Sequence, residues 1–140
     1  MKRVIVLLFL FLLVLSPFSS PWAKGSGGNR VIVYYFLTNF RCPSCYKIER
    51  YTKEAVEHYF KDELTSGTLV FKPINIEEKK NQHFVKDYNL YTKSVVISLI
   101  KEGKEAKYDN LMKVWEYLGD KEKFYGYIKT ETAKYLEEVK

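Results

Sequence analysis

The stretch VIVYYFLTNFRCPSCYKIE, residues 31–49, passes from an apolar run through two cysteines into a charged, periodic segment. Its first seven residues are apolar or aromatic and rich in β-branched types, which is typical of a strand buried on both faces. From Cys42 onward, apolar residues recur at spacings of three and four with charged residues between them. This pattern predicts an amphipathic helix of about 20 residues that ends near Glu63. The cysteines therefore lie where a buried strand passes into a helix.

The rest of the chain predicts an alternation of strands and helices. Pro73 cannot donate a backbone hydrogen bond, so its strand is expected at a sheet edge or with a bulge. The order predicts an α/β domain with a central mixed sheet of about four strands flanked by helices. Predicted strands span residues 31–37, 68–76, 94–101 and 105–111, and predicted helices span 42–63, 77–90 and 111–139 with a break at Gly119–Asp120.

The N-terminus is typical of an export signal. The start MKR is positively charged, residues 4–15 are an unbroken apolar run of 12, and small and polar residues follow. We interpret residues 1–23 as a signal peptide, or as an N-terminal anchor helix if it is not cleaved, residues 24–30 as a flexible linker, and residues 31–140 as the folded domain. The expected location is the periplasm or the outer face of the cytoplasmic membrane, with residues 4–15 as the only membrane contact.

Composition argues against several classes of function. The formal net charge is +6, but the lysines are interleaved with glutamates, which is typical of a solvated surface and not of a nucleic-acid site. There is no glycine-rich phosphate loop and no dinucleotide fingerprint, so we do not expect this chain alone to bind NAD or flavin. His58 and His83 are interpreted as ordinary surface residues.

The CxxC pair at the predicted helix start favours redox chemistry without a separate cofactor. Cys42 would meet the unpaired amides and positive dipole end of the helix, Pro43 suits the first helical position, and Arg41 adds a cation. These features lower the pKa of a thiol, so Cys42 is predicted to be the attacking sulfur. Cys45 lies three residues further on the same face and is predicted to resolve the mixed disulfide.

Two alternatives remain for the same residues. The pair forms a permanent local disulfide, whose short loop would contribute little stability, or the two thiolates bind a soft metal or metalloid such as Cu(I) or arsenite. Structural zinc is disfavoured because it takes four ligands and only one CxxC exists. Phe40 and Tyr46 flank the motif, and with the intervening Pro43 they are predicted to form a docking patch.

A strand followed by a CxxC that opens a helix resembles the thioredoxin superfamily, as does the predicted element order. More specifically, YYFLTNFRCPSCYKIE and VWEYLGDKEKFYGYI resemble the small exported ArsF family, described as a nitrophenyl compound nitroreductase subunit. This resemblance implies thiol-disulfide exchange with a partner protein, such as a membrane redox protein. Any flavin or nicotinamide would belong to a partner.

The thioredoxin resemblance also singles out the segment before the third predicted strand. Thioredoxins carry a proline there that faces the CxxC, and in this sequence the place is taken by Lys93 or Ser94. Lys93 is accordingly predicted to stabilise a thiolate, and Ser94 to contribute to substrate docking.

Overall fold

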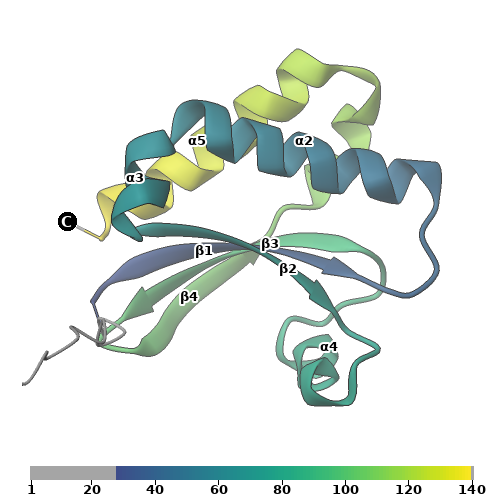
Figure 1. Cartoon of the computed structure of the whole chain (residues 1–140), viewed down its shortest axis with the longest axis horizontal. Helices are drawn as coiled ribbons and strands as arrows, with labels where there is room; N and C mark the ends of the chain where they lie inside the picture. Colours follow the sequence, from purple (N-terminus) through teal and green to yellow (C-terminus); the bar gives the residue numbers. More distant parts are fainter. Residues whose placement is uncertain (1–27, 140) are drawn as a thin grey trace, which may run out of the picture.

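The computed structural model describes residues 28–139, which form a four-stranded mixed sheet with helices on both faces (Figure 1). The strands lie in the order β2-β1-β3-β4. β1 pairs in parallel with β2 and antiparallel with β3, and β4 pairs antiparallel with β3. The predicted α/β class with a mixed sheet is confirmed. The strands are β1 (Arg30–Leu37), β2 (Leu69–Asn75), β3 (Ser94–Lys101) and β4 (Lys104–Asn110).

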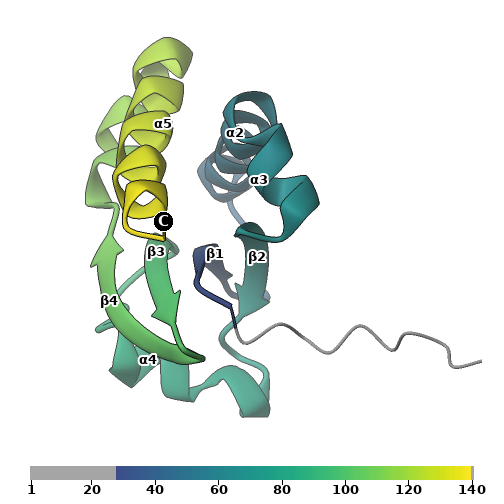
Figure 2. The same cartoon turned by 90° about the vertical axis from the view of Figure 1, so that its left-hand side faces the viewer.

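The long helices lie side by side on one face of the sheet (Figure 2). α2 directly follows β1, while α5 closes the chain after two short 3-10 helices. Among residues 28–139, the helix on the other face is the short α4, near the end of the sheet where α2 begins (Figure 1). The helices are α2 (Pro43–Tyr59), α3 (Lys61–Ser66), α4 (His83–Asp87) and α5 (Lys121–Glu137), with 3-10 turns at Lys79–Asn81, Met112–Val114 and Glu116–Gly119.

Alternate residues of β1 supply the two halves of the core. Val31, Val33 and Tyr35 are fully buried beneath α2 and α5. Ile32, Tyr34 and Phe36 face the opposite side, where aromatic rings from the α4 region pack on them. Each large side chain removed from water contributes roughly 1.5–3 kcal/mol. The central strand is thus held on both faces, as its unbroken apolar run predicted.

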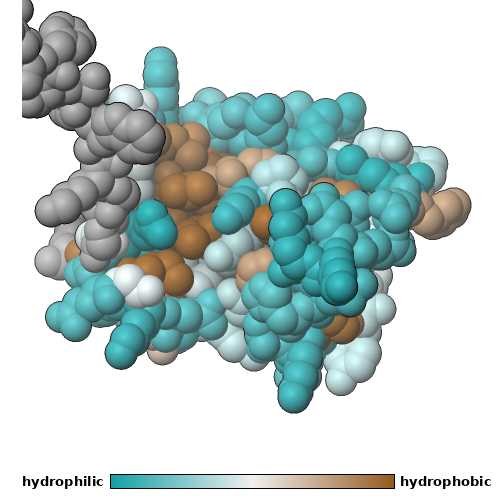
Figure 3. All heavy atoms as spheres, turned by 60° about the horizontal axis from the view of Figure 1, so that its bottom comes forward, coloured by the Kyte–Doolittle hydropathy of each residue, from teal (hydrophilic) through white to brown (hydrophobic). Residues whose placement is uncertain are grey.

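The face of the sheet that carries α4 is covered less completely than the face under the long helices. Figure 3 shows apolar residues grouped at the surface on this side of the molecule. Val70 and Ile100 pack against the core of this face but are only partly buried. The edge positions of the sheet are occupied by β4, which is almost wholly exposed, and by β2, which carries Pro73 as the sequence predicted.

The predicted helix 42–63 is divided in the structure. Phe60 leaves the helical region with φ −133° and ψ 40°, and its side chain is 7% exposed. The chain bends at this residue between α2 and α3, and the Phe60 ring belongs to the core under the helices. The predicted helix 77–90 is likewise reduced to a 3-10 turn and α4, and α5 begins only after Asp120 caps it through the Lys123 amide.

The predicted signal or anchor, residues 1–23, and linker residues 24–27 lie outside the described residues. Within the part of the chain that the structure describes, no helix is long and apolar enough to cross a membrane.

Candidate functional site

The CxxC motif lies at the junction that the sequence predicted, where β1 ends and α2 begins. Cys42 is the N-cap residue of α2, in an extended conformation, and Pro43 occupies the start of the helix. The Cys42 sulfur accepts a hydrogen bond from the Cys45 amide at 3.2 Å. No acidic residue lies in the first turn of α2, so the positive end of the helix is not neutralised there.

Cys42 and Cys45 form a disulfide, with their Cα atoms 5.1 Å apart. The two sulfurs differ in environment. Cys42 is partly exposed, whereas Cys45 is 1% exposed and packs toward the sheet. A partner sulfur can therefore reach Cys42 more readily than Cys45. The assignment of Cys42 as the attacking and Cys45 as the resolving cysteine stays a prediction.

Arg41 does not extend into solvent beside the disulfide. Its guanidinium pairs with the Glu49 carboxylate and stacks over the Tyr46 ring, with 4.1 Å from Cζ to the ring centroid. Burial lowers the pKa of Arg41, but the hydrogen bond and charge of Glu49 outweigh it and hold the pKa above its ordinary value. Arg41 is thus a fixed cation whose charge is already paired.

Tyr35 connects the central strand to the motif. Its hydroxyl donates a hydrogen bond of 2.7 Å to the Cys45 carbonyl, and its side chain is fully buried. Burial raises the pKa of Tyr35, and the neighbouring charge of Arg41 partly offsets the rise. The residues around the disulfide therefore include a buried phenol, a cation and a carboxylate in contact with one another.

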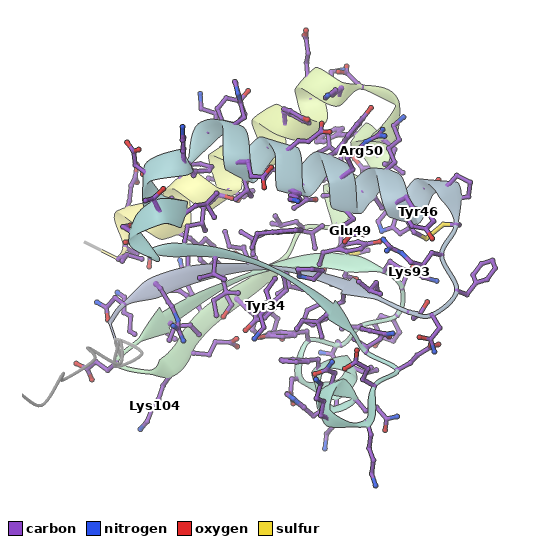
Figure 4. All side chains as sticks on the ribbon, in the orientation of Figure 1. Tyr34, Tyr46, Glu49, Arg50, Lys93 and Lys104 are labelled. Carbon is purple, nitrogen blue, oxygen red and sulfur yellow. A yellow bond between two sulfur atoms is a disulfide. The ribbon has the colours of Figure 1, made fainter. Side chains whose placement is uncertain are left out.

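Lys93 lies at the same end of the sheet as the motif. Its Nζ is 5.7 Å from the centroid of the Phe40 ring, and its carbonyl accepts a hydrogen bond from the Trp115 indole at 3.1 Å. Figure 4 shows Lys93 and Tyr46 at the end of the molecule where the disulfide lies, with Lys104 at the opposite end. The structure thus brings Lys93 to the end of the molecule that carries the disulfide, with its ammonium group near the Phe40 ring.

The predicted docking residues divide into surface and buried positions. Phe40 is 75% exposed and Tyr46 55%, and Pro43 is also exposed. Ser94 is 2% exposed, and its hydroxyl donates to the Thr92 carbonyl at 2.9 Å. The structure therefore places Phe40, Pro43 and Tyr46 at the surface around Cys42, whereas the Ser94 side chain is inside the molecule.

Two exposed side chains were not expected from the sequence pattern. Tyr91 is 95% exposed and precedes Lys93 by two residues, and Met112 is 53% exposed in the segment after β4. The helical pattern predicts the charged residues between the apolar positions, Glu49 among them, on the solvent-facing side of the helix, but Glu49 is largely covered and pairs with Arg41.

Within the described part of the chain, no third metal ligand accompanies the two sulfurs. In residues 28–139 no three side chains from histidine, cysteine, aspartate and glutamate lie together as a possible metal site. His58 and His83 are both exposed, and His83 pairs with Asp87 on α4.

Comparison with known proteins gives similarity in structure only. No protein-family model matches the chain, and no curated protein matches it. Among solved structures, a thioredoxin mutant from Entamoeba histolytica is 19% identical with a TM-score of 0.42, covering 72% of this chain and 81% of its own. Oxidized thioredoxin O2 from Arabidopsis thaliana is 16% identical with a TM-score of 0.41, covering 69% and 76%. A malarial protein is 16% identical with a TM-score of 0.38, covering 58% and 80%.

Proposed function

We propose that this chain is a thioredoxin-like protein that exchanges a disulfide with a partner protein through Cys42 and Cys45. The observation that carries the proposal is the asymmetry of the pair. One sulfur caps a helix and is partly exposed, while the other is buried one turn further along. Helix N-termini bring cysteine pKa values down to roughly 3.5–7.5, which makes Cys42 a good nucleophile and leaving group at neutral pH.

The exchange conserves electrons between the two proteins. A thiolate of a reduced partner attacks the Cys42 sulfur, the Cys42–Cys45 bond breaks, and Cys45 leaves as a thiolate that takes up a proton. The second partner thiol loses its proton and attacks the partner's sulfur in the mixed disulfide. This releases Cys42 as a thiolate and leaves the partner oxidised by two electrons. The same steps in reverse reduce a partner disulfide.

The proposal extends to location and partner. The charged and apolar N-terminus supports export, to the periplasm or the outer face of the cytoplasmic membrane, where a CxxC pair can remain oxidised. The resemblance to the ArsF family supports a partner in a redox system, such as a membrane redox protein. The exposed rings of Phe40 and Tyr46 support recognition of a protein surface rather than of a free small thiol.

Trapping tests the proposal directly. In Cys45→Ser the resolving sulfur is missing, so a partner that reacts with Cys42 should remain covalently attached and be released by reductant. Cys42→Ser is the matched control and should trap much less, because Cys45 is buried. A Cys42–Cys45 pair that does not equilibrate with thiol buffers, or equal trapping by both variants, would overturn the proposal.

A further inference from the structure

We propose that Glu49 sets the oxidising strength of the Cys42–Cys45 couple by neutralising the charge of Arg41. This inference rests on the exchange function proposed above and assigns two positioning residues to it. Neither residue reacts: Glu49 acts through Arg41, and Arg41 acts on the sulfur of its neighbour Cys42.

The helix brings Glu49 back toward the motif. Glu49 lies four residues after Cys45, on the same face of α2 and one turn further along. Side chains on a helix lean toward its N-terminus, so the carboxylate covers the turn that carries Cys45. Figure 4 shows Glu49 below α2, between the helix and the sheet. There it meets the guanidinium of Arg41, which enters from the other side of the motif.

Arg41 is fixed on several sides and only partly solvated. The Tyr46 ring covers one face of the guanidinium, and the Tyr35 hydroxyl, bonded to the Cys45 carbonyl, lies near it. The side chains of Arg41 and Glu49 are 21% and 25% exposed. Charges that are this well covered are screened by salt and water less than those of exposed pairs. The charges of this pair are therefore expected to act more strongly on neighbouring groups than those of an exposed pair.

The charge balance decides what Arg41 does for Cys42. Alone, a fixed cation next to the helix N-cap would stabilise a Cys42 thiolate strongly. With Glu49 bonded to it, the pair has no net charge, and the first turn of α2 contains no acidic residue. The Arg41–Glu49 ion pair therefore stabilises the Cys42 thiolate of the reduced protein less than Arg41 alone would. Because a stabilised reduced form makes a disulfide more oxidising, Glu49 keeps the couple more reducing than the motif alone would make it.

Three variants of the full chain test this inference against one control. Each variant is equilibrated with a dithiol buffer that becomes oxidised as Cys42–Cys45 is reduced. The fraction of protein with reduced cysteines then gives the equilibrium constant for exchange between the protein and the buffer. Glu49→Gln leaves Arg41 unpaired and should favour the reduced form about tenfold, equivalent to about 30 mV for a two-electron couple. Arg41→Gln should shift the constant in the opposite direction. Arg41→Gln with Glu49→Gln should return it close to that of the parent protein.

Glu57→Gln is the matched control, because it also removes one carboxylate from α2, where Glu57 pairs with exposed Lys53. It should leave the constant unchanged. A titration of thiolate absorbance should show the Cys42 pKa falling in Glu49→Gln only. The inference is overturned if Glu49→Gln behaves as Glu57→Gln does, or if the double variant keeps the full shift of Glu49→Gln. Failure of the parent protein to equilibrate at all would instead refute the exchange function.

Discussion

The Tyr35 hydroxyl donates a hydrogen bond of 2.7 Å to the carbonyl of Cys45, ten residues further along the chain. It ties the centre of the sheet to the first turn of α2, directly behind the disulfide. The donor belongs to a fully buried side chain, so water does not compete for it. This hydrogen bond holds the first turn of α2, and therefore Cys45, in a fixed position relative to β1.

Tyr35→Phe removes this hydrogen bond with almost no change in volume. The free energy of unfolding of the oxidised protein should fall by about 1 kcal/mol, the usual net contribution of a buried hydrogen bond. Urea unfolding measures the change. Tyr91→Phe is the control, because Tyr91 is 95% exposed and its loss should change the free energy by less than about 0.5 kcal/mol. Equal effects of the two variants would show that the bond to Cys45 does not stabilise the fold.

Replacing glycine by alanine should change the stability in opposite directions at two positions of the chain. Gly67 ends α3 in a left-handed conformation with φ 78°, which costs an alanine about 1 kcal/mol. Gly126 lies within α5, and a Cβ built there meets nothing within 4 Å, so alanine should raise stability by about 0.5–1 kcal/mol. Thermal or urea unfolding of Gly67→Ala and Gly126→Ala measures both. A stabilising Gly67→Ala would contradict the observed helix end.

Sequence patterns predicted those parts of the fold that depend on neighbouring residues alone, such as the central strand and the start of α2. An unbroken apolar run rich in β-branched residues makes a central strand, and a cysteine followed by proline makes a helix start. The position of Cys42 as N-cap follows from these two facts alone, as does the burial of Cys45 one turn further. The edge position of Pro73 follows from its missing amide hydrogen.

The parts that could not be predicted depend on which distant groups meet. Glu49 is surrounded in sequence by other charged residues, and nothing there shows that its partner precedes the helix. The bend at Phe60 interrupts a segment whose charged and apolar spacing continues the helical pattern, and no glycine or proline marks the break in the sequence.

Several tyrosines have raised pKa values in the folded protein, so the protein should lose stability at alkaline pH. Burial, together with the charge of Glu131, raises the pKa of Tyr127 from 10.0 to about 12. Between these two values the unfolded chain has released a proton that the folded chain keeps. The free energy of unfolding therefore falls as pH rises through this window, and the contribution is fully present below pH 10.

Tyr127→Phe removes one of these titrating groups and should make the decline above about pH 10 less steep. Urea unfolding of the oxidised protein at a series of pH values from about 8 to 11.5 measures the slope. Tyr88 and Tyr135 also have raised pKa values because they are buried, so part of the decline should persist. Tyr91→Phe, which alters an exposed ring, should leave the slope unchanged. An identical slope for Tyr127→Phe and the parent protein would contradict the predicted titration.

The interface between α2 and α5 contains two fully buried threonines with different hydrogen bonding. The Thr52 hydroxyl donates to the Ile48 carbonyl at 2.8 Å, whereas the Thr132 hydroxyl has no partner among the described residues. Valine matches threonine in shape and is equally β-branched, so each substitution changes essentially the hydroxyl alone.

The two substitutions should therefore change stability in opposite directions. Thr52→Val removes a satisfied hydrogen bond and should lower the free energy of unfolding by about 1 kcal/mol. Thr132→Val removes a buried polar atom that gains nothing from the fold, and should raise the free energy by about 1 kcal/mol. Urea unfolding of the two variants beside the parent protein measures both. A Thr132→Val variant as destabilised as Thr52→Val would contradict this prediction. It would mean that the Thr132 hydroxyl has a hydrogen-bond partner in solution, such as a buried water molecule.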